Sequence, residues 1–277
     1  MDKVELKTFE EFESKATVLW EDRQKKRKEK GEAFSPVLFR GQERASWCLQ
    51  TTLERYSTKQ YSPEDYYNVV RSVRPAIQSC TGKCWEFSDK YTREDGSSVR
   101  PPRPPQEYEF MVYLRLHGFP SPLLDWTRSF YFAAFFAFQS ATADEPHVAI
   151  YAFREYCGGG KRGWGDGATI VGCGPYITTH KRHVIQQTEY TFCKKKSSGQ
   201  CLYCSHEEAF ERNNEEAFKR NERDQDVLTK FIIPKTERAK VLDKLKMMNI
   251  TAYSLFGGEE SLLATLAYEE IERREFR

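Results

Sequence analysis

The stretch HGFPSPLLDWTRSFYFAAFFAF, from His117 to Phe138, decides the fold, because it is the most apolar part of an otherwise polar chain. Its second half is aromatic residues and alanine on every side, which is typical of a buried helix and predicts one over residues 129–141. Yet Asp125 lies in the middle, beside Trp126 and Thr127. Burying an unpaired carboxylate costs several kcal/mol. Asp125 therefore has a charged partner or faces a site.

The rest of the chain is polar but rich in large rings. Of its 277 residues, 30% are charged and 14% aromatic, so a core can be built from few, large side chains. The net charge of +2 neither favours nor excludes nucleic acid. No apolar run reaches the roughly 20 residues that span a bilayer, and the first residues lack a signal-peptide core. We expect a cytoplasmic protein without a membrane partner, whose eight cysteines are mostly reduced.

Helices and short strands alternate irregularly along the sequence. Periodicity predicts helices over residues 6–31, 61–92 (with an interruption), 106–118, 129–141, 235–249 and 259–276. It predicts strands over residues 37–39, 147–154, 168–172, 183–193 and 227–234, with a strand or turn over 250–256. This order indicates an α+β fold with a mixed, largely antiparallel sheet flanked by helices. We expect an N-terminal helix over 1–34 and a single domain over 35–277, with a charged, cysteine-rich insertion at about 193–226.

Several polar residues near the apolar stretch have purely structural interpretations. Arg40 and Asp125 could form an ion pair that fixes a strand to a helix. Asp125 or Thr127 could cap the following helix, and Trp126 could belong to the core. His117 precedes a glycine at a predicted helix end, where an imidazole commonly bonds the last carbonyl groups.

Four potential metal ligands lie close together in the sequence. They are Cys193, Cys201, Cys204 and His206. The two-residue gap between Cys201 and Cys204 lets both thiolates reach one zinc ion, and the other two could complete four ligands. The alternative is a surface loop of reduced cysteines.

Two further loops suggest binding or movement. Lys194–Lys196, with Lys181–His183, form the best basic patch, and Tyr190, Phe192 and Tyr203 between them could stack on unpaired bases. A solvated loop is the alternative, since acidic residues follow at once. The glycine-rich residues 158–167 lack the ending of a phosphate loop and predict a mobile lid.

Three segments together resemble the FRG-domain family. They are LFRGQ (38–42), LRLHGFPSPLLDWTRSFYFAAFFAF (114–138) and the segment 230–269, and the name reflects Phe39-Arg40-Gly41. The family also has a strand with a glutamine pair, matched by HVIQQTEYTF (183–192). A glycine usually follows that pair, and Thr188 stands there in this chain. The resemblance covers most of residues 35–270.

A more distant resemblance is to ADP-ribosyltransferases of the Arg-Ser-Glu type. Arg40 on an early strand, then Thr127 and Ser129 before an Ala- and Phe-rich helix, follow the order of that pattern. The resemblance implies an ADP-ribosyltransferase-like sheet and NAD as the substrate. It implies that NAD is held by Arg40, Gly41, His117, Asp125, Trp126, Thr127 and Ser129, with Trp126 or Phe119 as an aromatic wall. It also implies a catalytic set of Arg40 with Gln186, Gln187 or Glu189, where a glutamine would depart from the usual glutamate.

The two resemblances imply an NAD-dependent ADP-ribosyltransferase. Its acceptor would be a macromolecule, either nucleic acid or protein, and its role bacterial anti-phage defence or toxin action. The alternative is a module of the same fold that binds a nucleic acid or nucleotide without chemistry, because one fold hosts many functions.

Overall fold

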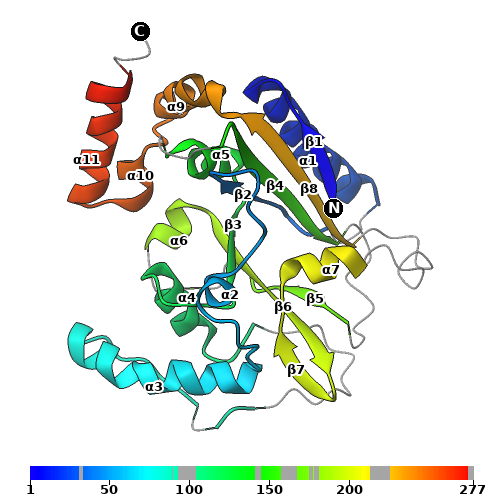
Figure 1. Ribbon diagram of the computed structural model, residues 1–277, viewed down its shortest axis with the longest axis vertical. Coiled ribbons are helices and arrows are strands. Elements are labelled where there is room, and N and C mark those ends of the chain that lie inside the picture. Colours follow the sequence, from blue (N-terminus) through cyan, green and yellow to red (C-terminus); the bar gives the residue numbers. More distant parts are fainter. Residues whose placement is uncertain are drawn as a thin grey trace.

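The computed structural model describes residues 1–30, 34–88, 90–92, 104–140, 145–156, 167–174, 177, 181–212 and 225–273. They form one eight-stranded sheet in the order β1-β8-β4-β2-β3-β6-β5, with β7 added beside β6 (Figure 1). The strands are β1 (Asp2–Glu5), β2 (Val37–Gln42), β3 (Leu124–Thr127), β4 (His147–Tyr156), β5 (Thr169–Gly172), β6 (Thr188–Ser197), β7 (Gln200–Tyr203) and β8 (Gln225–Pro234). β1 and β8 are parallel, and the other pairs are antiparallel. The expected α+β fold with a mixed, largely antiparallel sheet is confirmed.

Helices flank this sheet. They are α1 (Phe9–Lys30), α2 (Thr52–Tyr56), α3 (Pro63–Thr81), α4 (Tyr108–Leu116), α5 (Phe130–Phe138), α6 (Lys181–Ile185), α7 (His206–Arg212), α9 (Arg238–Met247), α10 (Ala252–Phe256) and α11 (Glu259–Ala267). A 3-10 turn, η1 (Lys235–Glu237), precedes α9, and a π-helical turn, η2 (Tyr268–Glu272), follows α11. No helix within these ranges is both long and apolar enough to cross a bilayer.

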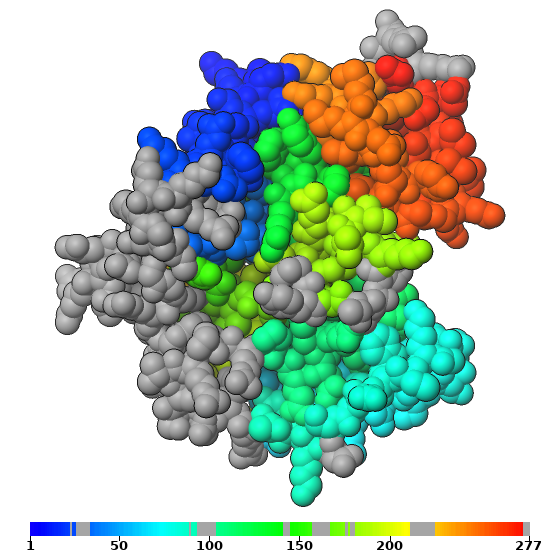
Figure 2. All heavy atoms as spheres, turned by 180° about the vertical axis from the view of Figure 1, so that it is seen from behind, coloured from blue at the N-terminus to red at the C-terminus, as the bar shows by residue number. Residues whose placement is uncertain are grey.

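The central strand β4 is buried on both faces. Val148, Ile150 and Ala152 point to one core, and Tyr151 and Phe153 point to another, because successive side chains of a strand alternate. The first core lies under α1, α5 and α9. Seen from behind, the green α5 lies between the blue α1 and the orange α9 (Figure 2). The predicted buried helix of the apolar stretch is therefore confirmed, and it forms the middle of that core.

The N-terminal segment shares this core. Phe9, Phe12 and Ala16 of α1 are buried, and the ring of Phe12 packs edge-on against that of Phe231 in β8. The preceding strand β1 pairs with β8. The first thirty residues therefore join the rest of the fold twice, through β1 at the edge of the sheet and through α1 in the core.

Two predicted strands are partly or wholly wrong. Residues 181–185 form α6, and β6 begins only at Thr188, after Gln187 takes a left-handed backbone with φ of 48°. Val184 and Ile185 suggested a buried strand, but they are exposed. Residues 252–256 form helix α10, because Thr251 caps its first turn through a reciprocal bond with Ser254.

The predicted insertion at about 193–226 contains ordered elements. It begins inside β6 and includes β7 and α7, whose Phe210 packs edge-on against Phe153. The predicted glycine lid over 158–167 lies outside the described residues, apart from Gly167.

Candidate functional site

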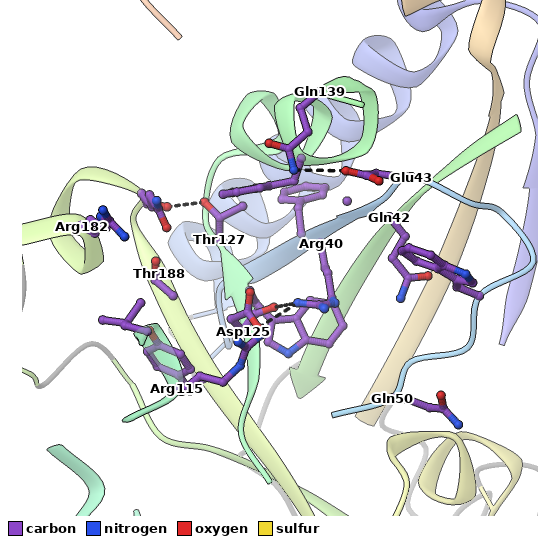
Figure 3. Close-up of a pocket in the computed structure, with 18 of the residues that line it drawn as sticks. Arg40, Gln42, Glu43, Gln50, Arg115, Asp125, Thr127, Gln139, Arg182 and Thr188 are labelled. Atoms are coloured by element: carbon purple, nitrogen blue, oxygen red, sulfur yellow. Dashed lines mark hydrogen bonds and ion pairs between the residues drawn. The ribbon is translucent and has the colours of Figure 1, made fainter. Parts of the chain in front are cut away.

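A cavity of about 610 Å³ lies where β2, β3 and β6 meet α2, α4, α5, α6 and α10 (Figure 3). The register explains the opening, because β2 and β3 pair only at Phe39 and Thr127. The polar side chains of its described lining are Arg40, Gln42, Glu43, Gln50, Arg55, Arg115, Asp125, Thr127, Gln139, Arg182, Gln186, Thr188 and Tyr190. The volume is within the range of small-molecule sites.

Asp125 lies on the floor of this cavity and is held by two arginines. Arg115 Nη2 donates to Asp125 Oδ1 at 2.6 Å, and Arg40 Nη1 lies 3.0 Å from the same oxygen. Arg40 also donates to the Asp125 backbone carbonyl at 2.8 Å. The Asp125 side chain remains 39% exposed, because it faces the cavity. A carboxylate occurs in the most apolar stretch because β3 carries it to a polar opening between strands.

Charge explains the protonation state of this cluster. Burial alone would raise the pKa of Asp125, but Arg115 and Arg40 outweigh that effect and hold the pKa well below its usual range. Asp125 in turn raises the pKa of Arg115. The cluster therefore stays ionised near neutral pH, with two guanidinium groups against one carboxylate.

A third arginine faces the same cluster but forms no ion pair. Arg55, on α2, is exposed, and its guanidinium makes no hydrogen bond or ion pair with any described residue; Asp125 and Glu54 act on it only at a distance. Its pKa is lowered by partial burial and then by the positive charges of Arg40 and Arg115. Three cations repelling one another around a single carboxylate favour an anionic ligand.

The lining also contains unpartnered buried polar atoms. Within the described part of the chain, Arg40 Nε, Arg115 Nε, Gln42 Oε1 and the Tyr190 hydroxyl have no hydrogen-bond partner. Each such atom costs on the order of 1–3 kcal/mol. Four of them around one cavity are unusual for a region that serves stability alone.

A second carboxylate lies across the cavity from the arginine cluster. Glu43 directly follows β2 and accepts a bond from Gln139 Nε2 at 3.3 Å (Figure 3). Glu43 forms no ion pair with the described residues, in contrast to Asp125. It is therefore a carboxylate that could approach a bound ligand without first releasing a cation.

The wall near α10 is aromatic and amide-bearing. The rings of Phe136 and Phe256 pack edge-to-face with centroids 5.9 Å apart. Arg182 Nε donates to the Phe256 carbonyl at 2.9 Å, and Gln186 Nε2 donates to the Leu255 carbonyl at 3.0 Å. These two bonds fix α10 against α6.

Six of the residues expected to bind or act on NAD line the cavity: Arg40, Gly41, Asp125, Trp126, Thr127 and Gln186. Gly41 also has a packing role. A Cβ there would lie 1.9 Å from the Ala133 carbonyl oxygen of α5, so a larger residue would displace the helix. Thr127 Oγ1 donates to the Gln186 carbonyl at 2.7 Å, joining β3 to the start of β6. Trp126 is also buried in the core, which is the structural role that the sequence suggested as an alternative.

The other expected residues lie outside the described lining of the cavity. The ring of His117 bonds the Tyr113 carbonyl at a distance of 2.8 Å, as expected for a helix end. Ser129, not Asp125 or Thr127, caps α5 by accepting from Phe132 N, so that capping prediction is wrong. The remaining three also have other surroundings: Phe119 packs in a core, the Gln187 carbonyl accepts from Arg128 N, and the buried Glu189 pairs with the Arg128 guanidinium.

The four predicted zinc ligands do not form one group. Cys193 Sγ and Cys204 Sγ are 3.4 Å apart, but His206 Nε2 bonds the Thr191 hydroxyl and Cys201 lies opposite Lys196. In the ranges that the structure describes, no three Cys, His, Asp or Glu residues form a group that could hold a metal ion. Zinc has no ligand set there.

The lysines and aromatic rings of the predicted basic patch are not arranged to bind nucleic acid as expected. Lys195 pairs with Glu208 at 2.6 Å, and Lys194 lies over the ring of Phe192. Tyr190, Phe192 and Tyr203 are buried in the core, so these three rings are not available to stack on bases. The cations of the cavity, not this strand, are the best candidate anion site.

Comparisons with known proteins bear on the first resemblance. Residues 35–146 match the family model of the FRG domain, which includes β2, α4, β3 and α5 and thus most of the cavity. No curated protein and no solved structure matches the chain.

Proposed function

We propose that the cavity, most of which is formed by the residues that match the FRG domain, binds NAD, and that the protein transfers ADP-ribose from it to a macromolecule, either nucleic acid or protein. The observation that carries the proposal is the convergence of Arg40, Arg55 and Arg115 on one carboxylate inside a cavity of about 610 Å³. Arginine binds phosphate in two-pronged fashion, and NAD carries a pyrophosphate.

The order of strands supports the same proposal. The segments that resemble the Arg-Ser-Glu pattern lie on β2, β3 and β6, which are neighbours in the sheet. Arg40, Thr127 and Gln186 from those segments line one cavity. Residues far apart in the sequence thus line one cavity, as a binding site requires.

The transfer reaction requires a carboxylate or amide oxygen near the transferred ribose. When the bond to nicotinamide breaks, nicotinamide leaves with the electron pair, the ribose becomes oxocarbenium-like, and the nucleophile of the acceptor attacks it and loses a proton. A carboxylate or amide oxygen lowers the energy of that positive charge. Glu43 and Gln186 are the candidates in the cavity, because Asp125 is neutralised by two arginines and Glu189 by Arg128.

The experiment is incubation of purified protein with NAD and separate pools of DNA, RNA and cell protein. We expect nicotinamide release and an ADP-ribose mass shift in one pool. The Arg40→Ala variant, verified as folded by circular dichroism, should lose both signals. No nicotinamide release from the folded wild-type protein in any pool would contradict the proposal.

The second candidate is a module that binds a nucleotide or nucleic acid without chemistry. It is favoured by one observation: the best-placed acid, Asp125, is already committed to two arginines. This candidate predicts salt-sensitive binding of nucleotides or nucleic acid, unaccompanied by any nicotinamide release, since phosphate contacts weaken as salt rises.

A further inference from the structure

We propose that the cavity orients its ligand, with a doubly charged phosphate group against Arg40, Arg55 and Arg115 and an uncharged planar ring against Phe136 and Phe256. This inference rests on the proposed function and deepens it, because it says where the pyrophosphate and the uncharged ring of the dinucleotide lie in the cavity. Three observations support it: the positive charge of the arginine end, the guanidinium donors of Arg55 that have no partner, and the aromatic wall of Phe136 and Phe256.

The charge of the arginine end is the first step. Arg40, Arg55 and Arg115 outnumber the two carboxylates that act on Arg55, which are Asp125 and the neighbouring Glu54. The described lining of the cavity contains four arginines but only Asp125 and Glu43 as carboxylates, so its formal charge is +2. The pyrophosphate of NAD carries two negative charges, and it would neutralise this end.

The second step is the difference between the three arginines. Arg40 and Arg115 are largely buried and committed to Asp125, so they provide a fixed positive field. Arg55 is exposed and lies on the short helix α2, and its guanidinium makes no hydrogen bond or ion pair with the described residues. All the guanidinium N–H groups of Arg55 are available, so Arg55 is the residue expected to contact the phosphates directly.

The opposite end suits an uncharged ring. Phe136 and Phe256 present edge-to-face rings, and aromatic groups of a ligand add favourably to such a pair. Gln139 directly follows α5, and Gln186 is bonded to the Leu255 carbonyl of α10, so both side chains line this part of the cavity and can bond a polar ring edge. Gln139 lies beside Glu43 at the top of Figure 3, whereas Arg115 and Asp125 lie below.

The test compares two probes on the full chain by calorimetry. ADP-ribose carries the pyrophosphate, and adenosine carries a ring and ribose without charge. The variants are Arg55→Ala, Phe256→Leu and, as a matched loss of one positive charge, Lys59→Ala, whose side chain lies outside the described lining. Melting temperatures establish that each variant is folded.

Arg55→Ala should weaken ADP-ribose binding by about tenfold to hundredfold and leave adenosine binding unchanged, because only the phosphates are charged. Phe256→Leu should weaken both probes by about threefold to tenfold. Lys59→Ala should change neither. Equal losses for both probes in Arg55→Ala, no difference between Arg55→Ala and Lys59→Ala, or no binding of ADP-ribose by the wild-type protein would overturn the inference.

The same samples separate this inference from the reaction. If ADP-ribose binds with the expected pattern but NAD yields no nicotinamide with any acceptor pool, the proposed reaction fails and the ligand orientation stands. If nicotinamide is released yet Arg55→Ala binds ADP-ribose normally, the reaction stands and the orientation fails.

Discussion

Arg115 Nη2 lies 2.6 Å from Asp125 Oδ1, and this bond ties the helix before the proline-containing turn to the strand after it. Only ten residues separate the two in sequence. The contact closes the turn and at the same time sets the charge of the cavity floor, so local folding and ligand binding depend on the same carboxylate.

Asp125→Asn should lower the free energy of unfolding by about 2 kcal/mol, because it leaves Arg40 and Arg115 without their counter-ion; the cost is moderated by the exposure of the carboxylate to the cavity. Urea denaturation measures this. Asp243→Asn is the matched control, because its ion pair with Arg273 is on the surface and should contribute less than about 1 kcal/mol. Equal losses in the two variants would contradict the structural importance of Asp125.

The contribution of Asp125 should depend on pH in one direction. Its pKa is lowered in the folded protein, so the folded state binds this proton less readily than the unfolded state. The stabilisation is fully present above the unfolded value of about 4 and is lost as the pH falls from there towards the folded-state pKa. The difference in unfolding free energy between wild type and Asp125→Asn should therefore be constant between about pH 5 and 7 and shrink below about pH 4. A difference that grew on acidification would contradict this account.

Gly41→Ala should be among the most damaging single changes. The added Cβ would meet the backbone of α5, with the Ala133 carbonyl oxygen at 1.9 Å, and backbone cannot rotate away. We expect a loss of more than about 3 kcal/mol or no folded protein. Gly199→Ala is the control: Gly199 has open space around it and a φ of 79°, so only the backbone strain of about 1 kcal/mol applies. Thermal denaturation compares the two.

Lys230 should hold the loop that follows β2. It is buried, and its Nζ donates to the carbonyl of Ala45 at 2.6 Å and lies 3.4 Å from that of Trp47, which lines the cavity. Lys230→Met leaves the Ala45 carbonyl without its donor, whereas the Trp47 carbonyl still accepts from the Tyr151 hydroxyl at 3.0 Å, and we expect a loss of about 1–2 kcal/mol. Faster amide hydrogen exchange over residues 44–49 would report the loosened loop. Lys240→Met, which removes a surface lysine, should leave those amides unchanged.

Glu43→Gln should lower nicotinamide release by about hundredfold while leaving ADP-ribose binding within about twofold, since a carboxylate that stabilises only the transition state affects kcat. Glu189→Gln should have little effect, because Glu189 is buried against Arg128 and away from the cavity. The reverse ranking of the two variants would assign the catalytic carboxylate to Glu189.

The sequence predicted the sheet class, the buried helix and the Arg40–Asp125 pair, because each depends on a strong local pattern or on the cost of a buried charge. Arg55, Arg115 and Glu43 were missed, and Arg182 was expected only as part of a basic patch. Arg115, Glu43 and Arg182 stand inside or directly beside the family motifs, so their positions carried a signal. Arg55 did not, because it reaches the cavity only through the packing of α2, which no local pattern encodes.

The strand predicted at 183–193 is wrong over residues 183–187, and the strand or turn predicted at 250–256 is a helix over most of its length, for a related reason. β-branched and aromatic residues favour strands on average, but α6 and α10 are short helices held by capping and by contacts with each other. Glu189 was expected near NAD because of its place in the sequence. The period of two along β6 points Glu189 to the opposite face from Thr188 and Tyr190, which line the cavity.

The pairing of β1 with β8 has a consequence for synthesis. Asp2 aligns with Thr229, so β1 leaves the ribosome more than two hundred residues before its partner strand β8. Until β8 and α9 have been made, they cannot cover Phe9 and Phe12 of α1, and a nascent chain would expose these rings to chaperones. Pairing between β1 and β8 is also slow, since contacts of such long sequence separation come late.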